Sequence, residues 1–215
     1  FSFKARQVLD SRGRHTIQAE INGFTGTAPS GASTGSHELP EKRGKNGFSD
    51  QVNKINSLQP QTFSSLGEFD AYVAKLSLGS TASTALSFAA ARAFAFQDNL
   101  PLWKYLSKIS GFTSKMPFLQ FNVLNGGKHA GLENDFQEHM YVAKHKTFTD
   151  RVFAGANVYS ELKSALVSSF GARSALVADE GGFAPQIETL RERFNLIEKA
   201  AENAGQTPFL ALDAA

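Results

Sequence analysis

Two stretches in the second half of the chain constrain its fold most, because each joins an apolar, strand-like run to glycines and acids. The first is FNVLNGGKHAGLENDFQE at residues 121–138, and the second is ADEGGFAP at residues 178–185. Strands hold side chains rigidly, whereas glycine lets a backbone turn sharply or approach a ligand closely. The density of carboxylate, imidazole and glycine predicts a polar catalytic pocket. Short motifs also arise by chance, so two strand ends with ordinary loop chemistry stay a second interpretation.

Strands and helices alternate in this part of the chain. The pattern predicts strands over 118–124, over 136–143 and from 208 onward, and amphipathic helices over 147–169 and 187–204. Such alternation is typical of a parallel α/β sheet or barrel. Active sites of α/β barrels lie at the carboxyl ends of the strands. We therefore expect an α/β fold with a barrel-like second part.

The first part of the chain has a different pattern. Residues 3–21 predict two strands around a turn at 10–13, and a third strand follows near Phe24. The strongest helix pattern covers residues 82–96, where an apolar stripe is expected to pack in a core. The residues of this stripe are Phe88, Ala91 and Ala95.

A change of pattern marks a domain boundary. Residues 111–117 are polar, contain glycine and end in proline, which is typical of a junction between domains. We expect one domain at 1–112 and a second at 113–215.

Four acids stand in or beside the strand-like runs of the second part: Glu138, Asp179, Glu180 and Asp213. Carboxylate oxygens are hard ligands that suit Mg²⁺, and two carboxylates in different environments can divide the roles of acid and base. The chain has no cysteine, and its five histidines show no HxxxH pairing, which disfavours a zinc site. The residues by themselves favour a Mg²⁺-assisted reaction on an anionic substrate.

A second candidate segment is PSGASTGSHE at residues 29–38, whose small, polar, glycine-punctuated composition predicts a loop. Ser33 or Thr34 could offer a hydroxyl to Mg²⁺ or to a phosphate, as loop hydroxyls do in P-loop proteins. Because the GxxxxGK[ST] pattern is absent, a plain surface loop is the alternative.

Composition narrows the classes of partner. A net charge of +2 gives no electrostatic footprint for nucleic acid or for an anionic membrane surface. No apolar run approaches the roughly 20 residues that cross a bilayer. The absence of cysteine suits a reducing compartment, so we expect a cytoplasmic protein without nucleic-acid or membrane partners.

Six motifs in one order make the chain resemble the enolase family. They are ARQVLDSRG, PSGASTGxHE, FNVLNGGxHAG, QE, DEGGFAP and ALDAA. The resemblance implies a small α+β N-terminal domain, followed by the first part of a modified TIM-type α/β barrel that is incomplete in this chain. It also implies the reversible dehydration of 2-phosphoglycerate to phosphoenolpyruvate in glycolysis and gluconeogenesis, with two Mg²⁺ in each active site.

The resemblance assigns roles to particular residues. Glu180 is expected to protonate the departing hydroxyl, with help from Glu138. Asp213 is expected to bind the tighter Mg²⁺, and Ser33 the second. The residues expected to contact the substrate are Gly31, Ala32, His129 and Gln137.

The resemblance also implies partners. Enolases continue for about as long again, and that remainder carries the other acidic metal ligands and the lysine that acts as the base. We therefore expect the missing barrel half as a second chain or as a remainder of this one, and a homo-oligomer of the complete enzyme.

Some positions depart from the family pattern and keep other functions open. Lys128 stands where a small polar residue is usual, and His139 stands where Phe is usual. The second hypothesis is therefore a non-catalytic enolase-like structural or binding protein, and the third is another Mg²⁺ lyase of the superfamily. The first hypothesis, enolase chemistry, is favoured because the chain keeps the expected acids and metal ligands, which are Ser33, Glu138, Glu180 and Asp213.

Overall fold

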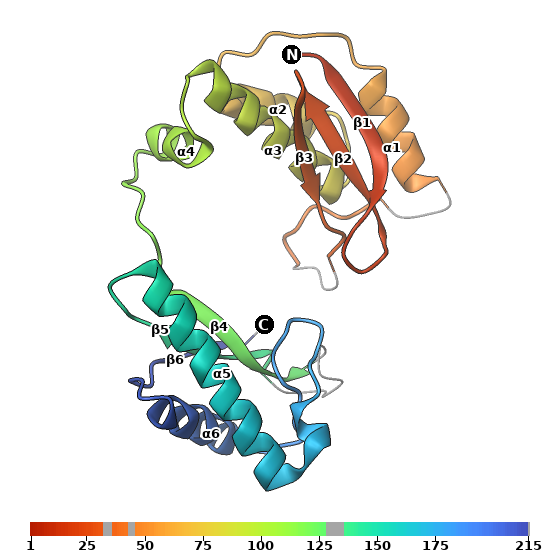
Figure 1. Cartoon of the computed structure of the whole chain (residues 1–215). Coiled ribbons are helices and arrows are strands. Elements are labelled where there is room, and N and C mark those ends of the chain that lie inside the picture. The colour runs from red at the N-terminus through yellow and green to blue at the C-terminus, as the bar shows by residue number, and fades with distance from the viewer. Residues whose placement is uncertain (32–35, 43–45, 128–135, 215) are drawn as a thin grey trace. The chain divides into compact units, whose positions relative to one another are not determined.

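The computed structural model describes residues 1–31, 36–42, 46–127 and 136–214, which divide into two units. Unit 1 is Phe1–Lys115 and unit 2 is Met116–Ala215 (Figure 1). Each unit has a three-stranded sheet and a hydrophobic core of its own.

An antiparallel sheet forms the centre of unit 1. Its strands, in order, are β1 (Phe3–Leu9), β2 (His15–Ile21) and β3 (Phe24–Ala28). Asp10 closes the first turn, because its carboxylate accepts the backbone N–H groups of Arg12 and Arg14, each at 2.9 Å. The second turn is Asn22-Gly23, whose φ angles of 51° and 88° suit a two-residue hairpin loop. The three predicted strands are confirmed.

The described part of unit 1 also has four helices: α1 (Gly47–Asn56), α2 (Leu66–Lys75), α3 (Ser80–Gln97) and α4 (Leu102–Ser110). The helix predicted over 82–96 is confirmed within α3, which packs on β2 and β3. The contact with β3 is close: a Cβ atom at Gly26 would lie 2.1 Å from the backbone oxygen of Ala85.

The close contact explains why one core prediction is wrong. Ala91 and Ala95 are buried as predicted, but Phe88 is 47% exposed. Small side chains allow the helix to approach the sheet, and a ring does not fit between them. The Cβ of Phe88 already lies 2.9 Å from where a Cβ at Gly26 would be, so its ring turns outward at the edge of the contact.

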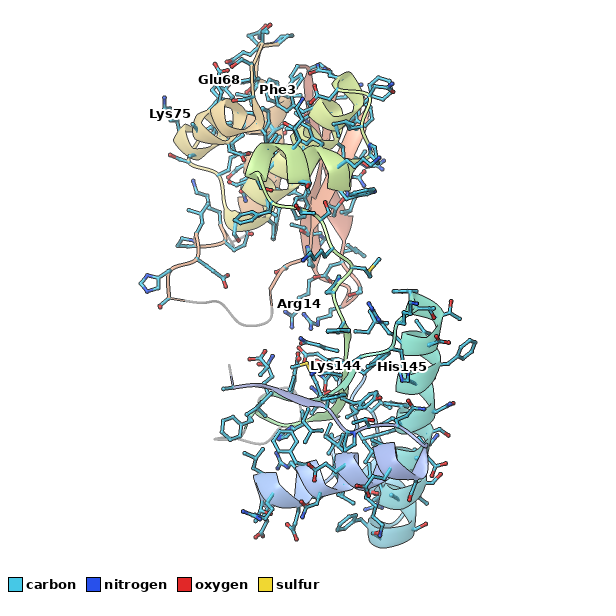
Figure 2. The ribbon with its side chains drawn as sticks, turned by 90° about the vertical axis from the view of Figure 1, so that its left-hand side faces the viewer. Phe3, Arg14, Glu68, Lys75, Lys144 and His145 are labelled. Atoms are coloured by element: carbon cyan, nitrogen blue, oxygen red, sulfur yellow. The ribbon has the colours of Figure 1, made fainter. Side chains whose placement is uncertain are left out.

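The sequence of α2 favours a helix at both ends. The Ser65 side chain accepts the backbone N–H of Glu68, and the Glu68 carboxylate accepts the backbone N–H of Ser64 at 2.7 Å. Glu68 is in the first turn and Lys75 in the last, where their charges complement the helix dipole (Figure 2). These local contacts fix α2 against the core through Phe69 and Val73.

Unit 2 is built on β4 (Leu119–Asn125), β5 (Glu138–Ala143) and β6 (Leu210–Asp213), in that order. The helices described in unit 2 are α5 (Phe148–Phe170), the short 3₁₀ helix η2 (Ala172–Ala175) and α6 (Leu190–Asn203). Thr147 and Thr189 cap α5 and α6 by accepting the backbone N–H three residues ahead. The predicted strands and helices of this part are confirmed.

The expected parallel pairing is wrong for these three strands. β4 pairs with β5, and β5 with β6, in antiparallel register. One return helix between neighbouring strands makes them parallel. Two helices, α5 and α6, separate β5 from β6. The chain therefore crosses the sheet twice between these strands, and β6 runs opposite to β5. A parallel contact does occur at Leu124 and Phe183.

The core of unit 2 places the helices on the sheet. Buried residues of α5 and α6 pack with Val123, Leu124 and Tyr141 of the strands. The α/β fold class is confirmed. Among the described residues, no helix combines the length and apolar character needed to span a membrane.

Candidate active site

Three of the four candidate acids come together in unit 2. Glu138 is the first residue of β5 and Asp213 the last of β6, and the antiparallel register places them directly opposite each other. Glu180 comes from the loop between η2 and α6, and its carboxyl is hydrogen-bonded to that of Glu138. Asp179, the fourth acid, is exposed.

Hydrogen bonds and a ring contact hold the loop that carries Glu180. Phe183 donates its N–H to the Val123 carbonyl at 2.9 Å, and Asn125 donates its N–H to the Phe183 carbonyl at 2.8 Å. Tyr159 of α5 stacks on the Phe183 ring at 4.3 Å between centroids and donates to the Gly181 carbonyl at 2.8 Å. The loop is therefore fixed both to the end of β4 and to α5.

Glycine is required at both positions after Glu180. Gly181 has φ of 90°, a conformation that L side chains rarely adopt. Gly182 is buried, and a Cβ there would lie 2.6 Å from Asn125 Oδ1. The turn predicted at this glycine pair is confirmed, and the close contact at Gly182 is with Asn125.

Two asparagines of β4 contact the Glu180 carboxylate. Asn125 Nδ2 donates to Glu180 Oε2 at 3.1 Å, and Asn122 Nδ2 approaches the same oxygen at 3.5 Å. Sequence reasoning missed both residues, because an Asn in a strand-like run carries no chemical signature. Their repetition at the NVLN spacing was the available signal.

The environment of Glu138 favours its protonated form. Burial raises the pKa of Glu138, and the hydrogen bond and negative charge of Glu180 and the charge of Asp213 raise it further. The Gln137 side chain acts in the opposite direction. Crowded carboxyl groups of this kind hold a proton between them or attract a cation.

Gln137 is fixed beside this cluster by its backbone. It donates its N–H to the Asp213 carbonyl at 3.0 Å, and its own carbonyl accepts the N–H of Gly126 at 2.9 Å. Its side chain is hydrogen-bonded to Glu138. Of the described residues among those expected to contact the substrate, Gln137 lies beside the acids in unit 2.

The other expected site residues are placed differently. Gly31 is exposed in unit 1, next to buried Ser30. Backbone N–H groups of Arg14, Arg12 and Ser30 lower the pKa of Asp10, so this carboxylate joins the first turn to the start of the loop. Ala32, Ser33 and His129 lie outside the described residues.

The donor set suits a hard cation but is incomplete within the described residues. Carboxylate oxygens are the ligands that Mg²⁺ prefers, and a cation would relieve the repulsion that raises the pKa of Glu138. In the part of the chain that the structure describes, no three His, Cys, Asp or Glu side chains are arranged to hold a metal ion. The fit rests on the chemistry of the acids rather than on a finished site.

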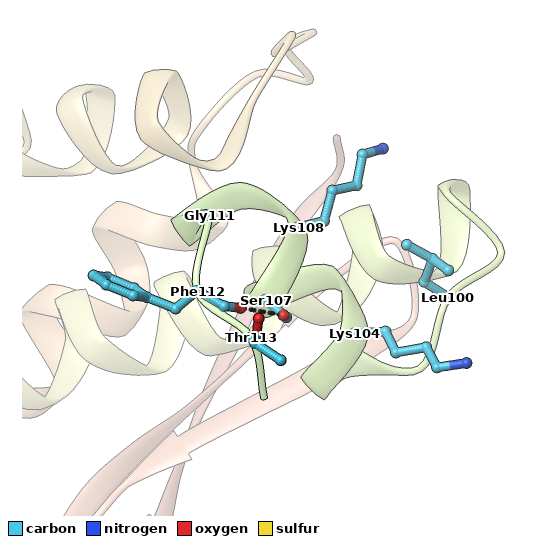
Figure 3. Close-up of a pocket in the computed structure, with 7 residues that line it drawn as sticks. All are labelled: Leu100, Lys104, Ser107, Lys108, Gly111, Phe112 and Thr113. Carbon is cyan, nitrogen blue, oxygen red and sulfur yellow. Dashed lines mark hydrogen bonds between the residues drawn. The ribbon is translucent and has the colours of Figure 1, made fainter. Parts of the chain in front are cut away.

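Unit 1 has a hollow of its own beside α4. Its volume is about 480 Å³, and its lining includes Lys104, Ser107, Lys108 and Phe112 (Figure 3). Lys108 is paired with Asp98 at 2.9 Å, and Ser107 Oγ donates to the Phe112 carbonyl. Its lysines stand on an exposed helix face, and none of the acids described above lines it.

Comparison with known proteins matches both units. The model of the enolase N-terminal domain matches residues 2–106, and that of the enolase C-terminal TIM barrel domain matches residues 113–215. The enolase of Methanocaldococcus jannaschii is 36% identical over 98% of this chain and 56% of its own length. The enolase of Methanopyrus kandleri is 37% identical over 100% of this chain and 56% of its own length.

The enolase of Methanococcus vannielii is likewise 37% identical, over 95% of this chain and 53% of its own length. The chain thus spans about half the length of the curated relatives it matches. The predicted fold, an enolase N-terminal domain followed by part of the barrel, is confirmed. From the two domain matches and these relatives, we conclude that the chain belongs to the enolase family.

Proposed function

We propose that this chain contributes to the reversible, Mg²⁺-dependent dehydration of 2-phosphoglycerate to phosphoenolpyruvate. It would act together with the part of the barrel that the relatives have beyond this span. The convergence of Glu138, Glu180 and Asp213 at one end of the strands of the unit 2 sheet carries the proposal. Residues 1–112 would then be the capping domain, and residues 113–215 the first part of the barrel.

Glu180 would be the acid of the reaction. In the dehydration, the substrate loses a proton from C2 to a base and its C3 hydroxyl as water, and Glu180 would give that leaving hydroxyl its proton. Glu138 shares a hydrogen bond with Glu180 and has a raised pKa, so it would keep a proton available to the pair. We assign the role of the base to none of the lysines in this chain.

Asp213 and Ser33 would contribute to holding Mg²⁺. When bound, the metal supplies positive charge that stabilises the enolate-like charge of the substrate. Asp213 is fixed by its position at the end of β6, opposite Glu138. Its carbonyl also accepts the Gln137 N–H, which limits how far this strand end can move.

Four further residues would contact the substrate: Gly31, Ala32, His129 and Gln137. Gln137 is the best placed of the described ones, since its side chain already bonds to Glu138. We further propose a cytoplasmic location and a homo-oligomeric complete enzyme, as the family resemblance implies.

The test is the interconversion of 2-phosphoglycerate and phosphoenolpyruvate, followed by ultraviolet absorbance. The purified chain is assayed alone and with a second polypeptide that carries the rest of a relative's barrel, each with and without Mg²⁺. We expect activity that requires the complement and Mg²⁺ and is lost in Glu180→Gln. The Glu180→Gln variant also controls for enolase from the expression host.

Two outcomes would contradict the proposal. Turnover retained in Glu180→Gln would remove Glu180 from the role of acid. Inactivity of a folded, stoichiometric complex would favour the second hypothesis, a non-catalytic relative that acts as a structural or binding protein. Lys128 favours that alternative, since a long cation stands where the family pattern has a small residue.

A further inference from the structure

Asn122 and Asn125 of β4 reach the same carboxylate although the strand should separate them. In an unbroken strand, successive side chains alternate between the two faces, so residues three apart point in opposite directions. Both side-chain amides nevertheless contact Glu180 Oε2, at 3.5 and 3.1 Å. The backbone between them must therefore depart from the regular pleat.

The register of β4 with β5 contains that departure. Asn122 is opposite Met140, but the next pair is Leu124 with His139, which leaves Val123 as an extra residue on β4. One extra residue in a strand is a β-bulge, which bends the strand and re-aims the side chains that follow. The bulge thus brings Asn122 and Asn125 to the same side.

A buried imidazole lies at the bulge. His139 is fully buried, and its Nδ1 is 3.2 Å from the Leu124 carbonyl oxygen. Because a carbonyl can only accept, Nδ1 carries the proton of this hydrogen bond. The His139 ring also packs edge-on against Phe194 of α6, at 5.6 Å between centroids. His139 therefore links the bulged part of β4 to α6.

Gly182 leaves room for both amides. Its N–H donates to Asn125 Oδ1 at 3.0 Å, which orients that amide with its nitrogen toward Glu180. A Cβ at this position would lie 2.6 Å from Asn125 Oδ1 and 2.8 Å from Asn122 Oδ1. Any larger residue would push both amides away from the carboxylate.

Asn122 is held at a cost in stability. Its Oδ1 atom is buried and has no hydrogen-bond partner among the described residues. An unsatisfied buried acceptor loses its bonds to water without replacement, so an apolar residue of similar size would be tolerated as well or better. Packing alone does not explain an asparagine at this position.

We propose that Asn122 and Asn125 are positioning residues that hold the Glu180 side chain toward Glu138, and that the Val123 bulge lets both of them do so. The value of this positioning for dehydration rests on the proposed function. The orientation of Glu180 is a property of the folded chain and can be measured without activity.

The test compares the full chain with Asn122→Leu, Asn125→Leu and the double variant. Asn157→Leu on the exposed face of α5 is the matched control. Scalar couplings of isotope-labelled Glu180 report its side-chain rotamer by nuclear magnetic resonance. We expect one dominant rotamer in the parent and in the control, and an average over several rotamers in the double variant.

The thermal midpoint distinguishes positioning from a merely structural role. If Asn122 positions Glu180, Asn122→Leu should free the Glu180 side chain without lowering the midpoint, because the substitution also removes the unsatisfied acceptor. If Asn122 serves only the stability of the fold, the midpoint should fall and Glu180 should keep its rotamer. Gly182→Ala should loosen Glu180 with both asparagines present. If the complemented enzyme is active, the double variant should lose roughly 100-fold in kcat with little change in KM.

The proposal is overturned if Glu180 keeps its single rotamer in the double variant. Should Asn125→Leu fail to fold, Asn122→Leu and Gly182→Ala decide the question, and an unchanged Glu180 in both overturns the proposal. A loosened Glu180 in a chain that shows no enolase activity in any form would support the positioning and reject the proposed function. Full activity with an unmoved Glu180 would reject the positioning alone.

Discussion

Glu138 and Asp213 lie directly opposite each other on β5 and β6, so two acids face across one antiparallel pair of strands. Like charges in directly opposed positions destabilise a sheet. Here the opposition coincides with a third acid, Glu180, which is hydrogen-bonded to Glu138. An arrangement that works against the stability of the fold is typical of a functional site.

Removing the charge of Glu180 should lower the pKa of Glu138. Burial is the largest cause of the raised pKa, and the hydrogen bond and charge of Glu180 follow it in size. Glu180→Gln removes that charge. Carbon-detected titration of labelled glutamate side chains measures the change. Glu202→Gln, on the exposed surface of α6, is the control. An unchanged pKa of Glu138 in Glu180→Gln would contradict the placement of the two carboxyls.

The same shift has a consequence for stability. The pKa of Glu138 is raised in the folded protein above its usual 4.5. The contribution of Glu138 to the free energy of unfolding is therefore greatest below pH 4.5 and is lost as pH rises through the pKa of the folded protein. The free energy of unfolding of unit 2 should therefore decline over that range, and less steeply in Glu138→Gln. Denaturant titrations at several pH values test this expectation.

Much of the fold could be predicted because local chemistry and the tertiary structure agree. The turn at residues 10–13, the helix pattern over 82–96 and the helices expected after residue 146 all indicate elements that form. Strand direction in unit 2 was not accessible in this way. The sequence pattern indicates both helices between β5 and β6, but it does not encode how they pack on the sheet, and that packing sets the direction of β6.

The acids of the site could be named from the sequence, whereas their support could not. Glu180 and Glu138 stand in motifs whose residue types predicted a carboxylate site, and the resemblance to enolases implied their individual roles. Asn122 and Asn125 acquire theirs only through a bulge, which depends on how β4 and β5 pair. A one-residue irregularity inverts the face of every later side chain, and no local pattern predicts it.

The contact of α3 with β3 should be intolerant of added volume. A Cβ at Gly26 would lie 2.1 Å from the Ala85 oxygen and 2.6 Å from the Ala89 nitrogen, and both are backbone atoms that cannot turn aside. Gly26→Ala should destabilise unit 1 by about 1–3 kcal/mol or more through overpacking. Chemical denaturation followed by circular dichroism measures the change.

Gly67→Ala supplies a control of opposite sign. Gly67 is exposed in α2, and a Cβ there would come no closer to its surroundings than 4.0 Å, the distance to the Ser65 hydroxyl oxygen. Alanine in place of an exposed glycine in a helix interior stabilises by about 1 kcal/mol, and because Gly67 is the second residue of α2, Gly67→Ala should stabilise unit 1 by no more than that. Equal effects of the two substitutions would show that the helix does not approach the sheet as closely as described.

Glu41 should make unit 1 sensitive to acid. Burial raises its pKa, but hydrogen bonds from Thr81, Ser80 and Gln51 outweigh this, and the net pKa is lowered. Its Oε2 accepts the Thr81 N–H at 2.9 Å and the Ser80 hydroxyl at 3.0 Å, at the start of α3. The stability it provides is present above the usual 4.5 and is lost as pH falls through the folded value.

Thermal unfolding of Glu41→Gln between neutral and acidic pH checks this. The variant should have a lower midpoint than the parent at neutral pH and a weaker dependence on acid. Glu20→Gln is the control, because Glu20 pairs with Lys4 at 3.7 Å on the surface, where such pairs contribute little. Parallel acid profiles for the parent and Glu41→Gln would mean that another carboxylate controls the acid sensitivity of unit 1.

Asp213→Asn should weaken Mg²⁺ binding if Asp213 is a ligand, as the proposed function requires. The substitution keeps the size of the side chain and its strand position but removes the negative charge that Mg²⁺ prefers. Calorimetric titration of the chain and of its complemented complex with Mg²⁺ measures the affinity directly, without turnover. Because Asp213 also helps to raise the pKa of Glu138, the variant should lower that pKa as well. Lowered pKa with unchanged Mg²⁺ affinity would keep Asp213 in the acidic cluster and remove it from the metal site, whereas loss of both would assign it to each.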